Sequence, residues 1–142
     1  MTLSDIPKYL RDQVLLRDEG QCRFCHLLQS GQGATFHIDH IHPKSRGGKT
    51  SLDNLACPCT NCSLHKSNRT TAVDPVTGDE STLYHPLVND WKQHFVLQAD
   101  GTCTGRTPTG RATIEVLQMN NYLPRLARAM QIQLGMLTAD QS

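Results

Sequence analysis

Four cysteines stand in two closely spaced pairs, Cys22/Cys25 and Cys59/Cys62. A Cys-x-x-Cys turn bends the backbone so that both sulfurs reach one ion, and two such turns supply the four thiolates of a tetrahedral zinc site. The N-terminal residues form no apolar run, so we expect no secretory signal and a reducing, cytoplasmic environment that disfavours disulfides. The spacing therefore predicts a structural Zn²⁺ bound by Cys22, Cys25, Cys59 and Cys62.

An acid–histidine pair, Asp39-His40, lies between the two cysteine pairs. A histidine near its ordinary pKa of about 6.5 can take a proton from water at neutral pH. A neighbouring carboxylate can hold a divalent cation, which relieves negative charge on a phosphate as a Lewis acid. Adjacent strand residues point to opposite faces, so both side chains can serve one site only if the strand twists or ends there. Pro43, shortly afterwards, is consistent with such an end.

The chain around the cysteine pairs predicts a strand hairpin followed by a short helix, with the metal at its base. A short apolar and β-branched stretch predicts a strand at residues 34–41. Residues 44–49 form a basic, glycine-containing loop, and a helix is expected to begin at Cys62. These elements would position the acid–histidine pair.

Further residues accompany the cysteines in a fixed order. They are Asp39-His40-Ile41, Pro43, Ser45, Gly47-Gly48, Asn54-Leu55, Cys59-x-x-Cys62 and Lys66. Through these residues the segment from Cys22 to Arg69, about a third of the chain, resembles the HNH endonucleases in their zinc-stapled ββα-metal (His-Me finger) form. Later motifs are similar to one bacterial branch of that family: Asp74-Pro75-Val76-Thr77-Gly78, Tyr84-His85-Pro86, Trp91 to Phe95 and Thr107 to Ala112.

The resemblance implies an α+β fold and an activity. The protein would be a metal-dependent endonuclease that hydrolyses DNA phosphodiester bonds by a one-metal mechanism. His40 would be the general base and Asp39 a ligand of the catalytic ion, Mg²⁺ or another divalent metal. Asn54 would brace the loop and orient the base.

The sequence departs from the family at the last position of the motif, where Ser63 replaces the usual histidine or asparagine. A hydroxyl is a weaker ligand for a divalent ion than either of those groups. We rank Ser63, or a water that it binds, first as the second catalytic-metal ligand. His37 comes second because it shares a strand face with Asp39. His65 comes third because two helical positions turn it about 200° from Ser63. Loss of activity is a fourth interpretation.

Positive charge is concentrated in the segment that carries the motif. The whole chain has a net charge of only +1, whereas residues 21–70 hold six basic and two acidic side chains. A phosphate backbone would bind such a segment, and these contacts would carry no sequence information. The predicted contacts are Lys44, Arg46, Lys49, Lys66 and Arg69. DNA is the expected partner, and nothing in the sequence separates it from RNA.

The regions that flank the motif predict helices and a second hairpin. Residues 4–18 predict a helix that packs on the zinc module, with Ser4 or Asp5 as the N-cap. Residues 70–81 form an acidic connecting segment that is rich in turn signals. Further along the chain, Asp100-Gly101 predicts a hairpin turn between short strands at 95–98 and 102–104. The apolar face of the N-terminal helix would comprise Ile6, Leu10 and Val14.

Two C-terminal helices are expected, at residues 107–120 and 122–137. Thr107 and Pro108 fit the cap and the first position of the earlier helix. The later helix has an apolar face at helical spacing, formed by Leu123, Leu126, Met130 and Leu134. Both helices are expected to pack on the module. Pairing with a second copy is the alternative, and the oligomeric state stays open.

The length fits one domain, with a core at 20–70 and an extension at 71–142. No apolar run is long enough for a membrane span. The competing functional hypothesis is a catalytically inactive zinc module that binds nucleic acid or protein, for which Asp39 and His40 would be dispensable. The sequence leaves open the sequence specificity, nicking against double-strand cleavage, and the biological role.

Overall fold

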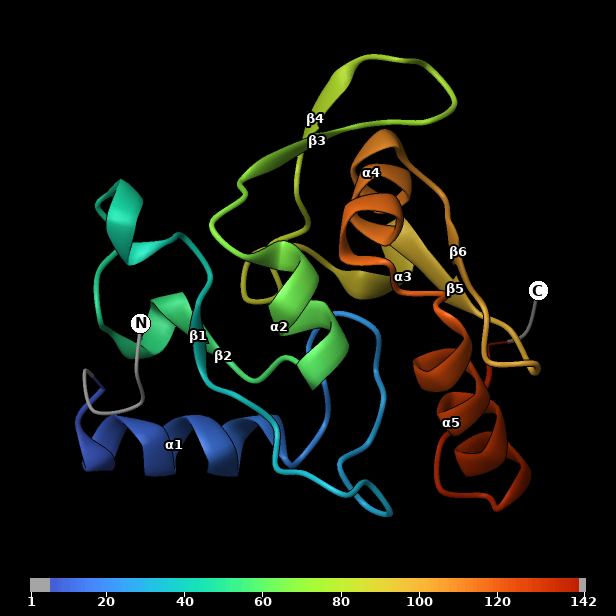
Figure 1. Cartoon of the computed structure of the whole chain (residues 1–142), viewed down its shortest axis with the longest axis horizontal. Coiled ribbons are helices and arrows are strands. Elements are labelled where there is room, and N and C mark those ends of the chain that lie inside the picture. Colours follow the sequence, from blue (N-terminus) through green and yellow to red (C-terminus); the bar gives the residue numbers. More distant parts are fainter. Residues whose placement is uncertain (1–5, 141–142) are drawn as a thin grey trace.

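The computed structural model describes residues 6–140 as an α+β fold that combines helices with three small antiparallel sheets of two strands each (Figure 1). In chain order the elements are α1 (Lys8–Asp18), β1 (Asp39–His40), the 3-10 turns η2 (Lys44–Arg46) and η3 (Leu52–Asn54), β2 (Leu55–Ala56), α2 (Thr60–Lys66), β3 (Thr71–Val73), β4 (Glu80–Thr82), α3 (Trp91–His94), β5 (Phe95–Leu97), β6 (Cys103–Gly105), α4 (Pro108–Leu117) and α5 (Tyr122–Gln133). No described helix is long and apolar enough to cross a membrane.

Helix α1 packs on the module, as its apolar spacing predicted. Its buried side chains form a small core cluster with Ile38, Leu55 and Cys57 of the hairpin region. Asp18, at the last position of the helix, accepts the backbone N–H of Cys57 at 2.9 Å. The predicted N-caps Ser4 and Asp5 lie outside the described residues, and Pro7 precedes the first helical residue.

Strand β1 is much shorter than the predicted strand at 34–41. Only Asp39 and His40 pair with β2, where Asp39 lies opposite Ala56 and His40 opposite Leu55. The preceding residues still alternate between buried and exposed, with Phe36 and Ile38 in the interior. The alternation therefore marked an extended segment correctly, but sheet pairing is limited by the two residues that β2 offers.

Helix α2 begins at Thr60, two residues before the predicted start. Cys59 occupies the N-cap position, and its Sγ accepts the N–H of Cys62 at 3.5 Å. The second cysteine pair therefore forms the first turn of the helix. This placement directs Ser63, one residue after the pair, toward β1.

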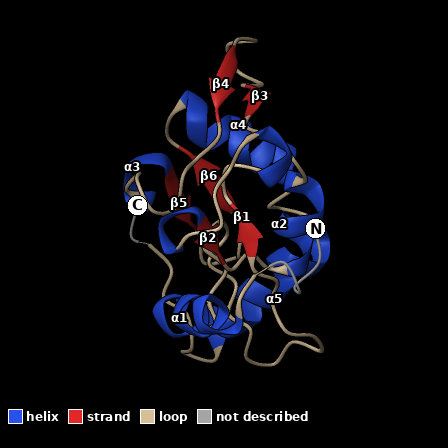
Figure 2. Cartoon of the chain, turned by 90° about the vertical axis from the view of Figure 1, so that its left-hand side faces the viewer, coloured by secondary structure: helices blue, strands red, loops and turns tan. Residues whose placement is uncertain are grey.

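The extension starts with a hairpin that sequence patterns did not predict. Strands β3 and β4 pair in register from Thr71–Thr82 to Val73–Glu80, and the hairpin projects from one end of the molecule (Figure 2). The Asp74 carboxylate organises its turn by accepting the N–H of Val76 and the hydroxyl of Thr77. The turn signals were therefore right, whereas the short polar strands carried no apolar pattern.

The rest of the extension shares one core with the cysteine pairs. Strands β5 and β6 form the predicted hairpin, and α4 starts at the predicted cap, where Thr107 Oγ1 accepts the N–H of Gly110 at 3.0 Å. Buried residues of this cluster include Phe24 and Leu27 beside the first cysteine pair, together with Trp91 and Phe95. The Trp91 indole N–H donates to the Phe24 carbonyl at 2.8 Å.

Helix α5 does not bury the predicted apolar face. Leu123 and Leu134 are each 73% exposed, and Met130 is 54% exposed. The buried side chains are polar: Arg128 is 0% exposed and Gln131 4%. Gln131 accepts the N–H of Leu28 and donates to its carbonyl. These hydrogen bonds, together with the partly buried Ala127 and Ile132 that pack against the core cluster, attach this helix to the cysteine module.

Candidate active site and metal centre

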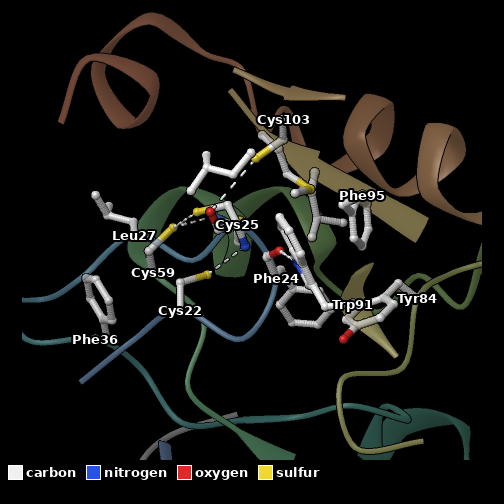
Figure 3. Packing of buried hydrophobic residues seen from close by; sticks show 14 of the residues in the cluster. Cys22, Phe24, Cys25, Leu27, Phe36, Cys59, Tyr84, Trp91, Phe95 and Cys103 are labelled. Atoms are coloured by element: carbon white, nitrogen blue, oxygen red, sulfur yellow. Dashed lines mark hydrogen bonds between the residues drawn. The ribbon is translucent and has the colours of Figure 1, made fainter. Parts of the chain in front are cut away.

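The four predicted cysteine ligands meet in the interior. Their sulfur atoms all lie within 4.8 Å of one another, and the Cys25 and Cys59 sulfurs are 3.7 Å apart (Figure 3). Each pair forms a turn in which the first sulfur accepts the N–H of the second cysteine, at 3.4 Å in the first pair and 3.5 Å in the second. All four are positioned to bind one metal ion, as the spacing predicted.

The cysteine thiols influence one another strongly. Burial and hydrogen bonds with Cys25 and Cys59 raise the pKa of Cys22 well above its usual value. Hydrogen bonds with Cys22 and the other two thiols raise the pKa of Cys62 and lower that of Cys25. Four thiolates in one buried place require a cation, which is the chemistry of a metal centre.

Three oxygen and nitrogen donors meet between β1 and α2. Ser63 Oγ, on α2, donates to Asp39 Oδ2 of β1 at 2.5 Å. His37 Nδ1 lies 3.3 Å from the same hydroxyl. The structure therefore brings together the first- and second-ranked metal ligands beside Asp39. A carboxylate, an imidazole and a hydroxyl form a donor set that fits a divalent cation accepting both oxygen and nitrogen.

His65 is not part of this group. Its Nδ1 bonds to the Asn61 carbonyl at 2.8 Å, one turn back along α2, and it does not line the adjacent cavity. The angular separation on the helix, which placed His65 third among the candidates, is what turns it away.

His40 lies next to this group and is 6% exposed. Its Nε2 is 2.8 Å from Thr50 Oγ1, a contact that fixes the orientation of the ring. Thr50 was not among the predicted site residues, because no spacing rule connects a loop threonine to a histidine ten positions earlier. Asp39 and His40 both line one open cavity of about 560 Å³, so the end of β1 lets adjacent residues face the same space.

Asn54 connects the two ends of the loop that follows His40. Its side-chain oxygen accepts the N–H of His42 at 2.8 Å, and its side-chain nitrogen donates to the carbonyls of His42 and Lys49. Its backbone carbonyl accepts the N–H of Ile41 at 2.8 Å. Asn54 thus replaces the strand pairing that β1 and β2 lack beyond His40.

Gly48 permits this loop to close. A Cβ atom at this position would lie 1.8 Å from the His42 carbonyl oxygen, which no side chain could tolerate. The Gly48 N–H donates to the Pro43 carbonyl at 2.9 Å. The glycine in the motif is therefore required by backbone packing and not by mobility.

The predicted basic contacts fall into two groups. Lys44 lines the cavity and Arg46 is exposed beside it, with its Nε donating to the Asn68 carbonyl at 2.9 Å. Lys49 and Arg69 are also exposed.

Lys66 differs from the other predicted contacts and corrects that prediction. It is 4% exposed, and its Nζ donates to the Ile41 carbonyl at 2.7 Å. Burial lowers its pKa, and the nearby Asp39 carboxylate opposes that effect. Lys66 therefore secures the end of β1 against α2 and does not present its charge to a ligand on the surface.

The model of the HNH endonuclease family matches residues 22–69. No curated protein matches the chain. HNH proteins are generally nucleases, and the matched segment contains the four cysteines, β1, the loop that Asn54 braces and α2. The match confirms the resemblance seen in the sequence: residues 22–69 of this α+β chain carry the HNH endonuclease signature.

Proposed function

We propose that the chain is a metal-dependent endonuclease that hydrolyses phosphodiester bonds of DNA. The observation that carries the proposal is the meeting of Asp39, Ser63 and His37 beside His40, within the segment that matches HNH endonucleases. The cysteine centre would hold a structural Zn²⁺, and residues 1–142 would act as one domain.

The catalytic cation would be held by Asp39, with Ser63 and His37 as further donors. When bound, it supplies Lewis-acid stabilisation of the negative charge that develops on the phosphate and the leaving oxygen. His40 accepts the proton of the attacking water, and Thr50 keeps its ring in position. Asn54 and Gly48 hold the loop that frames the cavity.

The nucleic-acid backbone would lie along the exposed basic side chains near the cavity. Lys44 lines the cavity and Arg46 is held beside it, so a phosphate that enters meets positive charge. Lys49 and Arg69 would extend this contact. Such contacts position a duplex without reading its sequence.

Cleavage of supercoiled plasmid by the purified protein tests the proposal. The reactions contain Mg²⁺, Mn²⁺ or Ni²⁺, with a chelator control, and compare the wild type with His40→Ala. We expect metal-dependent nicking that falls by about 10²–10⁴-fold in the variant, the usual contribution of a general base. His65→Ala is the matched control because this histidine lies outside the cavity.

The competing hypothesis, a zinc module that binds without cleaving, predicts a different result. The wild type would retain its metal and bind DNA, but it would cut with none of the three metals. The same assay with a single-stranded and a duplex RNA separates DNA from RNA as the substrate.

A further inference from the structure

Arg128 of α5 is a fully buried cation without a carboxylate partner. Its side chain is 0% exposed. Nε donates to the Gly101 carbonyl and Nη2 to the Met119 carbonyl, each at 2.8 Å. None of the ion pairs formed by the described residues includes Arg128. A buried charge is costly unless an opposite charge compensates it, so the position of this guanidinium needs an explanation.

The remaining end of the guanidinium points to that explanation. Nη1 is buried and has no hydrogen-bond partner of ordinary geometry among the described residues. Nη2 also lies 3.4 Å from the side-chain oxygen of Asn120. Two cysteines face the guanidinium as well: it interacts with the Cys25 side chain, and Cys62 lies within electrostatic reach. Both are ligands of the cysteine centre. The unsatisfied donor and the centre therefore occupy the same part of the core.

The positive charge of Arg128 can offset the negative charge of the metal-bound cysteine centre. Four thiolates around one divalent ion carry a net charge of −2, and the interior that surrounds them is apolar. We propose that Arg128 is the counter-charge of the cysteine centre, stabilising its metal-bound form through the Cys25 thiolate. The proposal rests on the metal occupancy proposed above, and it assigns a role to the extension that the HNH match at residues 22–69 does not cover.

A purely structural role is the alternative, because Arg128 also ties α5 to the β5–β6 turn. Other contacts already make that connection. Arg125, one turn earlier, donates to the Asp100 carbonyl at 2.9 Å, and Gly101 packs closely against the α5 backbone. Gln131 joins the same helix to Leu28 and Ser30. The two roles differ in whether the positive charge itself matters to the metal.

Three variants separate these roles: Arg128→Met removes the charge, Arg128→Lys keeps it without the forked geometry, and Arg125→Met is the matched control on the same helix. Zinc release from each full-length protein is followed with a chromogenic chelator. The absorption spectrum of the cobalt-substituted protein is recorded in parallel. A wild-type cobalt spectrum without thiolate charge-transfer bands would refute the metal centre itself, separately from the role of Arg128.

We expect Arg128→Met to release zinc about 10–100-fold faster, the usual effect of losing a group that supports a metal ligand. Its thiolate-to-cobalt band should shift to lower energy, because the sulfur loses a positive neighbour. Arg128→Lys and Arg125→Met should release zinc within about threefold of the wild type. Equal release from folded Arg128→Met and wild type would overturn the proposal. Zinc release from Arg128→Lys as fast as from Arg128→Met would also overturn the proposal. If Arg128→Met does not fold, fast zinc release from Arg128→Lys alone would overturn it.

Discussion

Ser63 is the residue that most changes the chemistry expected of this site. Related motifs place a histidine or an asparagine there, and the shorter serine side chain reaches Asp39 directly at 2.5 Å. His37, exposed on the preceding segment, lies 3.3 Å from the same hydroxyl. The imidazole thus supplies a nitrogen donor near the place where the motif normally has one. In this interpretation His37 and Ser63 together replace one stronger ligand.

If His37 and Ser63 share the role of metal ligand, substitutions at either residue should change the metal concentration that cleavage requires. Ser63→Asn should lower the metal concentration for half-maximal cleavage, and His37→Ala should raise it by about tenfold, or about 1.4 kcal/mol. Titration of plasmid nicking with Mn²⁺ measures both effects. His42→Ala, which alters an exposed histidine outside the three-donor group, is the control. An unchanged metal requirement in His37→Ala would exclude His37 as a ligand.

Individual residues were predictable from the sequence where their roles are set by local spacing. The cysteine pairs follow from two-residue turns, and Asp39-His40 from adjacency. The contacts of Thr50 and Arg128 were not predictable, because the fold brings their partners to them from elsewhere in the chain. Lys66 was placed in the wrong environment, since a sequence shows its charge but not its burial.

At the scale of elements, the strands are short, and side-chain hydrogen bonds supplement their pairing. Strands of two or three residues leave backbone groups that side chains must satisfy, as Asn54 does beyond β1. In the β3–β4 hairpin the same task falls to Asp74, which is buried and bound bidentately by Arg111 at 2.8 and 2.9 Å. The hairpin therefore depends on one carboxylate and on its attachment to α4.

The Asp74 contacts predict a dependence of stability on pH. Hydrogen bonds from Arg111 hold the pKa of Asp74 well below its usual value of about 3.9. A group with a lowered folded-state pKa contributes stability above its unfolded-state pKa, and this contribution is lost as the pH falls below it. Asp74→Asn should therefore destabilise the protein at pH 7, and its difference from the wild type should narrow below about pH 4.

Urea unfolding of the wild type and Asp74→Asn, followed from pH 7 to pH 3.5, measures this difference. Asp79→Asn, at an exposed position of the same turn, is the matched control. A gap between wild type and Asp74→Asn that stays constant over the whole range would contradict the assignment.

The helices were predictable to different degrees, depending on whether the sequence signals for them were local. Helix α4 was predictable because its cap and first-turn proline are local signals. The orientation of α5 was not, because two polar side chains lie at the centre of its buried face, with the partly buried Ala127 and Ile132 beside them. Here Gln131 and Arg128 bind backbone groups of distant segments, and Leu123 and Leu134 are left exposed.

At the scale of the molecule, the extension and the cysteine module share one interior. Asn61 of α2 donates to the carbonyls of Leu117 and Gln118 at the end of α4, and α2 packs beside α4. The Tyr84 N–H donates to Thr113 Oγ1 at 2.9 Å. We therefore propose a single cooperative unit, although the recognisable motif covers only residues 22–69.

Removal of the metal tests whether the extension and the cysteine module unfold as one cooperative unit. Structural zinc sites contribute about 10 kcal/mol or more, which is comparable to the whole stability of a domain. A strong chelator should therefore unfold α4 and α5 together with the module, in one transition seen by circular dichroism and by calorimetry. Cys22→Ser should reproduce the effect, whereas Cys57→Ser, outside the centre, should retain the metal. Two separate transitions, or an extension that stays helical, would show independent domains.

The position of Trp91 gives the molecule an optical reporter. It is the one tryptophan in the sequence. Its indole stacks on His26 at a centroid distance of 3.8 Å and donates to the Phe24 carbonyl, and both neighbours flank Cys25. Any change at the first cysteine turn alters the surroundings of this fluorophore. The emission of the unlabelled protein should therefore follow metal loading in real time, without a dye or a tag.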